Sequence, residues 1–456
     1  MVRAFGSHPK GLWFKSRRTH QKQDKTSNVV VRFISPISEK IALNTFAQLS
    51  GRFAVLTITL FITALVTRSL GRASYGDYSL ARNFMLLFTL GVDFGLNAVT
   101  VREITRQKGT TQRYFANLLS LRLLIASFFI ILGALLLPLF PYPTAVKWGI
   151  LITLLILIPW SLQATVNTIF QANLRYGLST FALVLGQLAT LILVYLGFLK
   201  GWGLLFFLGA GLVGHIILVV VAFNLVGRFG VTLSFGGDWK LWRRLLLLTL
   251  PLGLMLIFSE INAKADLFLL SLLPLPKRLG LGQSETVGVY SLAYQIFNNA
   301  IIFPTFFMNA FFPVMVVDFK EDWLRFIQRC RRAIAFLFGV SILGLGVGFT
   351  FAPWAIRIIA GEGFEHSATA LRILLLGLPL FFLTSPLQWF LVTVGKERIL
   401  PCIYGVAAVF NIFLNLIFIP KFSYQASAVL VLVTEGLILI LLGVASWKAL
   451  VTEPNK

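Results

Sequence analysis

Twelve stretches of about twenty predominantly apolar residues run through this chain, and only short polar connections separate them. A helix needs roughly 20 apolar residues to cross the hydrocarbon core of a bilayer, so each stretch is a candidate membrane span. No connection has room for a folded soluble domain of even about 50 residues. The sequence therefore predicts an all-α integral membrane protein with about 12 transmembrane helices. Their approximate bounds are 41–67, 76–100, 117–139, 147–171, 178–199, 203–226, 244–271, 287–316, 333–356, 370–394, 399–419 and 425–447.

The composition agrees with this prediction. Only 12% of the 456 residues are charged and 57% are hydrophobic, whereas soluble domains have about 25% charged and 45–50% apolar residues. These values exclude an ordinary soluble protein, and a disordered chain would not have so much apolar surface to bury. The two cysteines, Cys330 and Cys402, flank different spans. They therefore predict neither a disulfide framework nor a metal site.

Basic residues are distributed unevenly between the two sides of the predicted membrane. If the N-terminus lies inside and the spans alternate, the inside segments carry 27 of the 40 Lys and Arg residues and the outside loops carry 9. This bias follows the positive-inside rule and predicts a protein of the cytoplasmic (inner) membrane with both termini cytoplasmic. The net charge of +23 then reflects membrane topology. We expect no nucleic-acid partner, because no basic soluble domain is available to bind one.

Residues 1–40 form a separate polar segment with nine Lys and Arg residues. The segment has no apolar stretch of its own, so it is not a cleavable signal peptide. We expect a disordered cytoplasmic tail. The alternative is contact with the membrane surface through residues 29–37.

A short repeat divides the chain into two halves. Gly76-Asp-Tyr-Ser-Leu-Ala81 recurs as Gly288-Val-Tyr-Ser-Leu-Ala293, each time where a span begins on the outside. We therefore predict two six-helix bundles in the same orientation, related by a pseudo-two-fold axis along the membrane normal, which is a recurring plan of transporters. The predicted parts after the tail are a first bundle at 41–226, a cytoplasmic linker at 227–243, a second bundle at 244–447 and a cytoplasmic C-terminus at 448–456.

Charged side chains inside the first two spans mark a candidate site, because a charge within the membrane is costly unless it faces a cavity or a partner. Asn44, Gln48 and Arg52 follow one another at four-residue steps, so they share one helix face. Arg52 either binds an anionic head group or pairs with an acid such as Asp93. Arg82 either faces a cavity or snorkels to the outer interface.

Two further residues of the first half have alternative interpretations. Asp93 is interpreted first as the partner of Arg52 and second as a protonatable coupling site. Arg122 lies at the start of the third span. We interpret it as an anchor at the inner membrane interface.

The seventh span is unusually polar for a membrane helix. Glu260 and Lys264 stand four residues apart with Glu first, which is the favourable order for a helical ion pair. Asp266 and Asn262 form a second polar row, and two such rows cannot both face lipid. Pro251, near the start of this span, removes a backbone hydrogen bond and predicts a bend.

The eighth and twelfth spans add fewer polar groups. Gln295 and Asn298 lie in the eighth span, which pairs with the seventh as the second span pairs with the first under the repeat. Glu435 stands alone in the twelfth span beside Gly436. For Glu435, helix packing and a functional role are equally favoured.

Motifs for several enzyme classes are absent from the sequence. There is no G-x-x-x-x-G-K-[ST], no H-E-x-x-H and no G-x-S-x-G, so ATP hydrolysis, zinc-dependent proteolysis and serine hydrolase chemistry are not indicated. We therefore predict a secondary transporter with no catalytic residues, no metal site and no cofactor.

A series of short motifs near the start resembles a known family. In order, the motifs are Asn44-Thr45-Phe46, Gly51-Arg52, Thr67-Arg68-Ser69-Leu70-Gly71, Tyr75-Gly76-Asp77-Tyr78, Asp93-Phe94-Gly95-Leu96 and Val101-Arg102-Glu103-Ile104. The series resembles the opening of the Wzx-type polysaccharide (oligosaccharide) flippases. These belong to the multidrug/oligosaccharidyl-lipid/polysaccharide exporter superfamily, which includes multidrug extruders and the lipid II flippase.

The resemblance implies a V-shaped, alternating-access transporter. Its implied substrate is a polyprenyl-diphosphate-linked oligosaccharide, whose head group moves from the cytoplasmic to the outer leaflet. The implied pathway is the biosynthesis of a cell-surface polysaccharide, such as O antigen of lipopolysaccharide, capsule or exopolysaccharide. The implied partners are this lipid-linked oligosaccharide, membrane lipids, a polysaccharide polymerase and glycosyltransferases.

A diphosphate is anionic, so basic groups in a low-dielectric cavity would bind it strongly. We expect head-group contact from Arg52, Arg82 and Lys264, with Gln48, Asn44, Gln295 and Asn298 around them. We expect Asp93, Glu260 and Asp266 to form ion pairs or to couple transport to H⁺ or Na⁺.

Two other functions compete with this one. A cation-coupled multidrug extruder of the same superfamily would have an acid-dominated cavity, whereas the first two spans offer Arg52 and Arg82. A membrane-embedded polysaccharide polymerase or ligase would have a large outer loop and no two-fold repeat.

Overall fold

The computed structural model describes residues 36–106 and 109–452 of the chain. Side chains are described for residues 50–451, apart from positions 90, 98, 107, 108, 251 and 252. By its contacts the chain separates into residues 1–43 and residues 44–456. The predicted tail at 1–40 lies almost wholly outside the described residues, and the first helix begins at Pro36.

The described residues form helices joined by short turns, and they contain no strand. The α-helices are α1 (Pro36–Asp93), α2 (Leu96–Arg106), α3 (Thr111–Leu136), α4 (Thr144–Leu155), α5 (Leu157–Ala172), α6 (Tyr176–Lys200), α7 (Leu204–Val226), α8 (Trp239–Leu272), α9 (Gln283–Glu321), α10 (Trp323–Ala360), α11 (Glu365–Leu376), α12 (Leu378–Thr393), α13 (Leu400–Phe422) and α14 (Tyr424–Thr452). Single 3₁₀ turns occur at Leu137–Leu139, Gly227–Phe229, Lys277–Leu279 and Glu397–Ile399.

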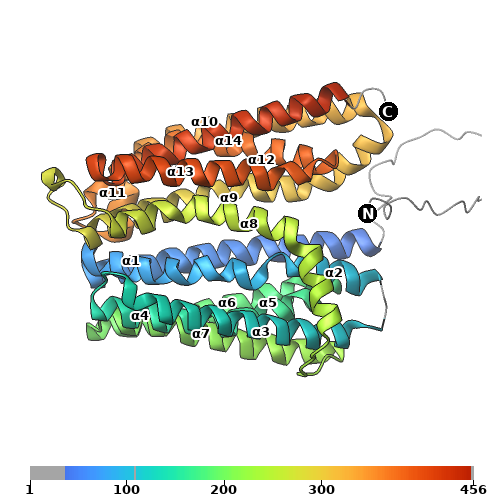
Figure 1. The fold of residues 1–456 in the computed structure, drawn as a ribbon, viewed down its shortest axis with the longest axis horizontal. Helices are drawn as coiled ribbons and strands as arrows, with labels where there is room; N and C mark the ends of the chain where they lie inside the picture. Colours follow the sequence, from blue (N-terminus) through green and yellow to red (C-terminus); the bar gives the residue numbers. More distant parts are fainter. Residues whose placement is uncertain (1–35, 107–108, 453–456) are drawn as a thin grey trace, which may run out of the picture. The chain divides into compact units, whose positions relative to one another are not determined.

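The long element α1 holds two helices that meet at Gly71, whose φ of 69° and ψ of −178° are not helical. Thr59 and Arg82 line one cavity although Gly71 lies between them in sequence. The chain therefore reverses at Gly71, and the two helices run antiparallel (Figure 1). Glycine suits this turn because it adopts positive φ without a steric penalty. The predicted outer loop between the first two spans is thus a tight turn.

Counting the spans confirms the predicted architecture. Nine helices in the described part of the chain are long and apolar enough to cross a membrane, and two bent pairs raise the number to eleven. The pairs are Trp239–Leu250 with Gly253–Leu272, bent by 56°, and Glu365–Leu376 with Leu378–Thr393, bent by 42°. The division of α1 at Gly71 brings the number to about twelve. The first bend lies where Pro251 predicts one.

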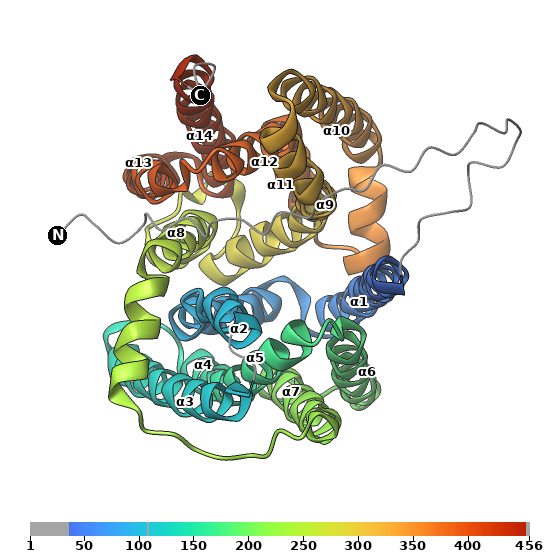
Figure 2. The same cartoon turned by 90° about the vertical axis from the view of Figure 1, so that its right-hand side faces the viewer.

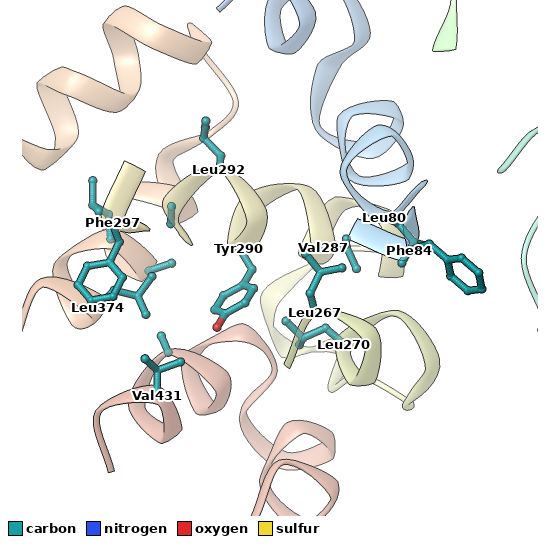
Figure 3. Packing of buried hydrophobic residues seen from close by; sticks show 14 of the residues in the cluster. Leu80, Phe84, Leu267, Leu270, Val287, Tyr290, Leu292, Phe297, Leu374 and Val431 are labelled. Atoms are coloured by element: carbon teal, nitrogen blue, oxygen red, sulfur yellow. The ribbon is translucent and has the colours of Figure 1, made fainter. Parts of the chain in front are cut away.

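Within residues 44–456 the helices form two bundles, α1–α7 and α8–α14, which Figures 1 and 2 show from the side and from one end. In the first bundle α6 packs on α7 and α3 on α5, and in the second α13 packs on α8 and α14. Buried apolar side chains also join the bundles. Leu80 of α1 lies near Val287 of α9 and near Leu267 and Leu270 of α8 (Figure 3).

The connection between the bundles is fixed to the first bundle. The backbone N–H of Gly236 donates to the carbonyl of Ala116 at 3.2 Å. Asp238 donates through its backbone N–H to Asn117 Oδ1 at 2.8 Å, and its carboxylate lies 2.6 Å from Arg113 Nη2. The connection therefore follows α3 before α8 begins.

The first part of α8 continues this attachment. Arg244 Nη2 lies 2.8 Å from the buried carboxylate of Glu103 on α2. Gly253, just after the bend, packs so closely on Phe94 that a Cβ at Gly253 would overlap the ring. The bend of α8 thus lies where the chain leaves the first bundle for the second.

The repeated hexapeptides meet where the bundles join. A Cβ added to Gly76 would overlap the carbonyl oxygen of Ser284, and a Cβ added to Gly288 would overlap that of Arg72. Both glycines begin a copy of the repeat, so the two copies pack against each other across the bundle boundary. The end of the protein that contains Gly71 is closed by this contact.

Candidate substrate cavity

Three basic side chains that the sequence places inside spans have no acidic partner. Among the residues whose side chains are described, no carboxylate lies within 4.0 Å of the charged groups of Arg52, Arg82 or Lys264. Each lies over an aromatic ring instead. Arg52 is 4.9 Å from the centroid of the Phe306 ring, Arg82 is 5.5 Å from that of Tyr78, and Lys264 is 5.4 Å from that of Tyr294.

A contact with an aromatic ring offsets only part of the hydration free energy that a cation loses when it leaves water. An uncompensated cation inside a membrane protein is costly, so it usually faces a wet cavity or a ligand. Arg82 and Lys264 come from different bundles, Arg82 from the second helix of α1 and Lys264 from α8. An anion between the bundles would lower the energy of both.

Arg52 lines a cavity of about 380 Å³. The walls come from α1, α5 and α6 of the first bundle and from Ile302 and Phe306 of α9, so the cavity lies where the two bundles face each other. Its remaining lining is rich in amides and hydroxyls, which can bind phosphate or sugar oxygens. These groups are Gln163, Asn167, Gln171, Tyr176, Ser179 and Thr180.

Arg82 lines a smaller cavity of about 180 Å³ inside the first bundle. The arginine is exposed, so snorkelling to an interface is not needed to hydrate it. Arg52 stands nineteen residues before Gly71 and Arg82 eleven residues after it. At 1.5 Å per helical residue, the two positions differ in depth by about 12 Å. They therefore form two separate basic positions.

A third cavity, of about 310 Å³, lies within the second bundle. It is lined by Glu260 and Glu435 and by neutral groups that include Asn298 and Tyr404. Glu435 accepts a hydrogen bond of 2.6 Å from Thr384 Oγ1, which gives this lone acid a partner and a place on a cavity wall. The second bundle thus contains an acidic cavity and the first bundle a basic one.

The predicted ion pair between Glu260 and Lys264 is not formed within 4.0 Å in the described part of the protein. Glu260 lines the cavity of the second bundle, while Lys264 turns toward Tyr294 on α9. A four-residue spacing permits a pair, but the tertiary environment of each side chain decides whether it forms.

The prediction that Asp93 pairs with Arg52 is wrong. Arg122 is its partner, with Nη2 2.5 Å from Asp93 Oδ1. Arg122 is completely buried, so its interpretation as an interface anchor is also wrong. The same Nη2 lies 3.2 Å from Asn97 Oδ1, which accepts a hydrogen bond of 2.6 Å from Thr168.

A local break in the helix follows directly after Asp93. Phe94 and Gly95 have φ values of 42° and 74°, so the helix that began after Gly71 ends at Asp93 and α2 starts at Leu96. Asp93 is therefore the last helical residue before the break, and its carboxylate contacts Arg122 of α3. An unbroken span, as the hydropathy predicts, would not reveal this break.

Asp266 lies in the interior of the second bundle, only 1% exposed. It accepts hydrogen bonds from Tyr290 Oη at 2.8 Å and from Asn415 Nδ2 at 3.1 Å. Tyr290 belongs to the second copy of the repeat. The carboxylate is therefore held by neutral donors from α9 and α13, and no cation pairs with it among the described side chains.

Gln295 joins the two bundles. Its Oε1 accepts a hydrogen bond of 3.0 Å from Tyr75 Oη, and its Nε2 donates to Thr63 Oγ1 at 2.8 Å. Its role in substrate binding stays a prediction. The side chains of Asn44 and Gln48 lie outside the described residues, although the backbone there is helical.

Several polar residues that line the cavities were not predicted from the sequence. The amides Gln163, Asn167 and Gln171 recur at four-residue steps within α5, and this face could have been recognised as it was for Asn44, Gln48 and Arg52. Trp160, Gln187 and His215 stand singly in apolar spans. Only the packing of the helices brings these three together.

Solved structures of membrane transporters share this fold. An inward-facing multidrug resistance MATE-family transporter of the MOP superfamily matches with a TM-score of 0.70 and 14% identity, covering 90% of this chain and 99% of that one. The lipid II flippase MurJ, in an inward closed conformation, matches with a TM-score of 0.72 and 16% identity, covering 89% and 87%. No curated protein sequence matches the chain.

A third solved structure is a MOP-superfamily transporter from Pyrococcus furiosus whose binding pocket is described as having reverse polarity. It matches with a TM-score of 0.63 and 15% identity, covering 90% of this chain and 95% of that one. At such identities the likeness establishes the fold alone. The protein is thus a multi-pass membrane protein with the two-bundle fold of MOP-superfamily transporters.

Two family models match the sequence itself. Residues 279–417 match the MatE family. Residues 41–317 match the family described as polysaccharide biosynthesis protein, which is more than half of the chain. The chain belongs to the polysaccharide biosynthesis protein family.

Proposed function

We propose that this protein is a flippase that moves a polyprenyl-diphosphate-linked oligosaccharide across the cytoplasmic membrane by alternating access, for the synthesis of a cell-surface polysaccharide. The observation that carries the proposal is the set of three basic side chains without acidic partners, Arg52, Arg82 and Lys264. An anionic head group would supply the missing charge. Its lipid tail would stay in the bilayer while the head group crosses between the bundles.

Arg52 is the residue we assign to the diphosphate. Its cavity is open to both bundles and is lined by amides and hydroxyls that can donate to phosphate oxygens. Hydrogen bonds between a guanidinium and a phosphate are charge-assisted and often bidentate, so they are strong and directional. Among the residues whose side chains are described, no acid lines this cavity, so none of them competes with the phosphate for Arg52.

The closed end supports alternating access. Gly76, Gly288 and the Gln295 hydrogen bonds join the bundles at the end that contains Gly71. Arg102 and Arg106, which are predicted to be cytoplasmic, lie on α2, beyond the helix that runs away from Gly71. With both termini cytoplasmic, the described conformation would be closed toward the outside.

The proposal is tested by reconstituting the protein in liposomes with a fluorescent polyprenyl-diphosphate oligosaccharide and measuring head-group crossing between leaflets. We expect crossing by the wild type and at least a tenfold loss in Arg52→Gln, as for a lost charge-assisted contact. The control is Lys147→Gln, outside all the cavities named here. Failure of the wild type to move the probe, in vesicles where folding is verified, would refute the proposal.

The acids Glu260 and Glu435 favour a second candidate, a cation-coupled multidrug extruder. They line the cavity of the second bundle, and neither pairs with a basic side chain within 4.0 Å in the described part of the chain. If the extruder function is correct, the same vesicles should transport cationic dyes and Glu435→Gln should abolish this transport. If the flippase function is correct, the vesicles should not transport the dyes. The remaining roles for the acids are then ion pairing or coupling to H⁺ or Na⁺, for Glu260, Asp93 and Asp266.

A further inference from the structure

A second cavity, inside the first bundle and lined by Arg82, takes no part in the proposed binding of a diphosphate at Arg52. It is enclosed by α1, α4, α5, α6 and α7, and its volume is about 180 Å³. It includes Arg82, which is exposed and shares a helix face with Tyr75, whose Oη donates to Gln295 of α9 in the other bundle. The cavity is therefore reached from the space between the bundles. Its depth differs from that of Arg52 by about 12 Å.

The lining of this cavity combines aromatic and hydrogen-bonding groups. Tyr78 and Trp160 supply aromatic surface, and Arg82, Gln187 and His215 supply polar groups. A sugar ring has an apolar face, formed by C–H bonds, and a rim of hydroxyls. Such a ring needs one aromatic wall and several hydrogen-bonding groups in the same small cavity, as binding sites with few, well-placed polar groups generally provide.

The polar groups are free to bind a ligand. The Nδ1–H of His215 donates to the carbonyl of Gly211 at 2.8 Å, so Nε2 is its remaining polar atom. In the described part of the protein, no side-chain hydrogen bond occupies the amide of Gln187 or the indole N–H of Trp160. No carboxylate lines the cavity. Among the described residues that line the cavity, Arg82 is the one with a permanent charge.

We propose that this cavity binds one sugar ring of the head group and that the ring carries a carboxylate, with Arg82 as its contact. The inference rests on the proposed flippase function and adds a substrate class, an oligosaccharide with an acidic sugar. The guanidinium fork matches the two oxygens of a carboxylate. A neutral sugar would offer Arg82 no counter-charge, whereas a carboxylate would pair with it inside the cavity.

The anion at Arg82 is distinct from the diphosphate at Arg52. The two positions differ in depth by about 12 Å, so a diphosphate held at Arg52 does not reach Arg82. The diphosphate joins the lipid to the first sugar, and the sugars extend away from the lipid. A sugar carboxylate is therefore the anionic group of the head group that reaches the cavity of Arg82.

The test compares two probes that differ in one group. Polyprenyl-diphosphate disaccharides ending in glucuronic acid or in glucose are placed in one leaflet of the vesicles, and head-group crossing is measured for the wild type and for Arg82→Gln. We expect Arg82→Gln to slow the glucuronic acid probe about tenfold or more and the glucose probe much less. Arg52→Gln should slow both probes equally, and Arg82→Lys should recover part of the loss.

Equal slowing of both probes by Arg82→Gln would show that Arg82 contacts the diphosphate, which overturns the inference and leaves the flippase function intact. No crossing of either probe by the wild type overturns both. A second measurement needs no variant. Free glucuronic acid at the cavity side should inhibit crossing of the glucuronic acid probe more than free glucose does, and equal inhibition would contradict the inference.

Discussion

Gly76 and Gly288, the first residues of the two repeated hexapeptides, face each other across the boundary between the bundles. A Cβ on either would overlap a carbonyl oxygen of the opposing helix, that of Ser284 or that of Arg72. The repeat therefore serves two purposes. It marks equivalent positions in the two halves, and it places small residues where the helices α1 and α9 come closest.

A larger side chain at this contact should weaken the closed end. We expect Gly288→Val to raise the free energy of the closed arrangement by about 1–3 kcal/mol, because backbone atoms on both helices would have to separate. Spin labels at Thr144 and Arg278, both exposed and in different bundles, would report a longer mean distance. Gly209→Ala is the matched control, since a Cβ there meets nothing within 4 Å. An unchanged distance in Gly288→Val would contradict the assigned contact.

The hydrogen bonds of Gln295 should contribute to the same closure. Gln295→Leu removes the bonds to Tyr75 and Thr63, and each bond contributes about 1 kcal/mol. The spin-label distance should shift in the direction expected for Gly288→Val. Asn299→Leu, on the same helix and without a side-chain hydrogen bond to another described residue, should leave the distance unchanged. A shift of equal size in both variants would show that Gln295 has no special role.

Removal of Arg122 should destabilise the first bundle. The Asp93 carboxylate would lose its cation in a largely buried position, and breaking a buried pair from one side costs about 3–5 kcal/mol. Because Asp93 is 22% exposed, the lower part of that range is expected for Arg122→Gln. Thermal unfolding in detergent measures the loss. Adding Asp93→Asn should recover part of it, whereas Arg102→Gln, an exposed change on α2, should have little effect.

The stability of the folded protein should depend on pH through the Asp238 carboxylate. The hydrogen bond from Arg113 lowers the pKa of Asp238 below its ordinary value, and the backbone N–H of Leu241 contributes in the same direction. Because the pKa is lower in the folded protein, this stabilisation is complete above the ordinary Asp pKa and is lost as pH falls through the folded-state value. The Tm difference between wild type and Asp238→Asn should therefore shrink as the pH is lowered below about 4. A difference independent of pH would contradict this role for the carboxylate.

The apolar stretches and the repeat were sufficient to predict the helical class, about twelve spans and the two-bundle plan. Hydropathy constrains these features because a membrane-spanning backbone must satisfy its own hydrogen bonds and must be about 20 residues long. The bend at Pro251 was predictable for a local reason, the missing N–H of proline. The cations inside the spans could also be identified from the sequence, because charged residues are rare within a membrane.

Which charges meet was decided by the tertiary structure. Asp93 pairs with Arg122 of α3 and is the last residue before a break at Phe94 and Gly95, which the hydropathy of this segment does not show. Glu260 and Lys264 have a favourable spacing, but Glu260 lines the cavity of the second bundle and Lys264 lies over the ring of Tyr294. Local sequence determines which helix face a residue occupies. The partner across that face depends on the helix crossing, which is set by contacts between residues far apart in the chain.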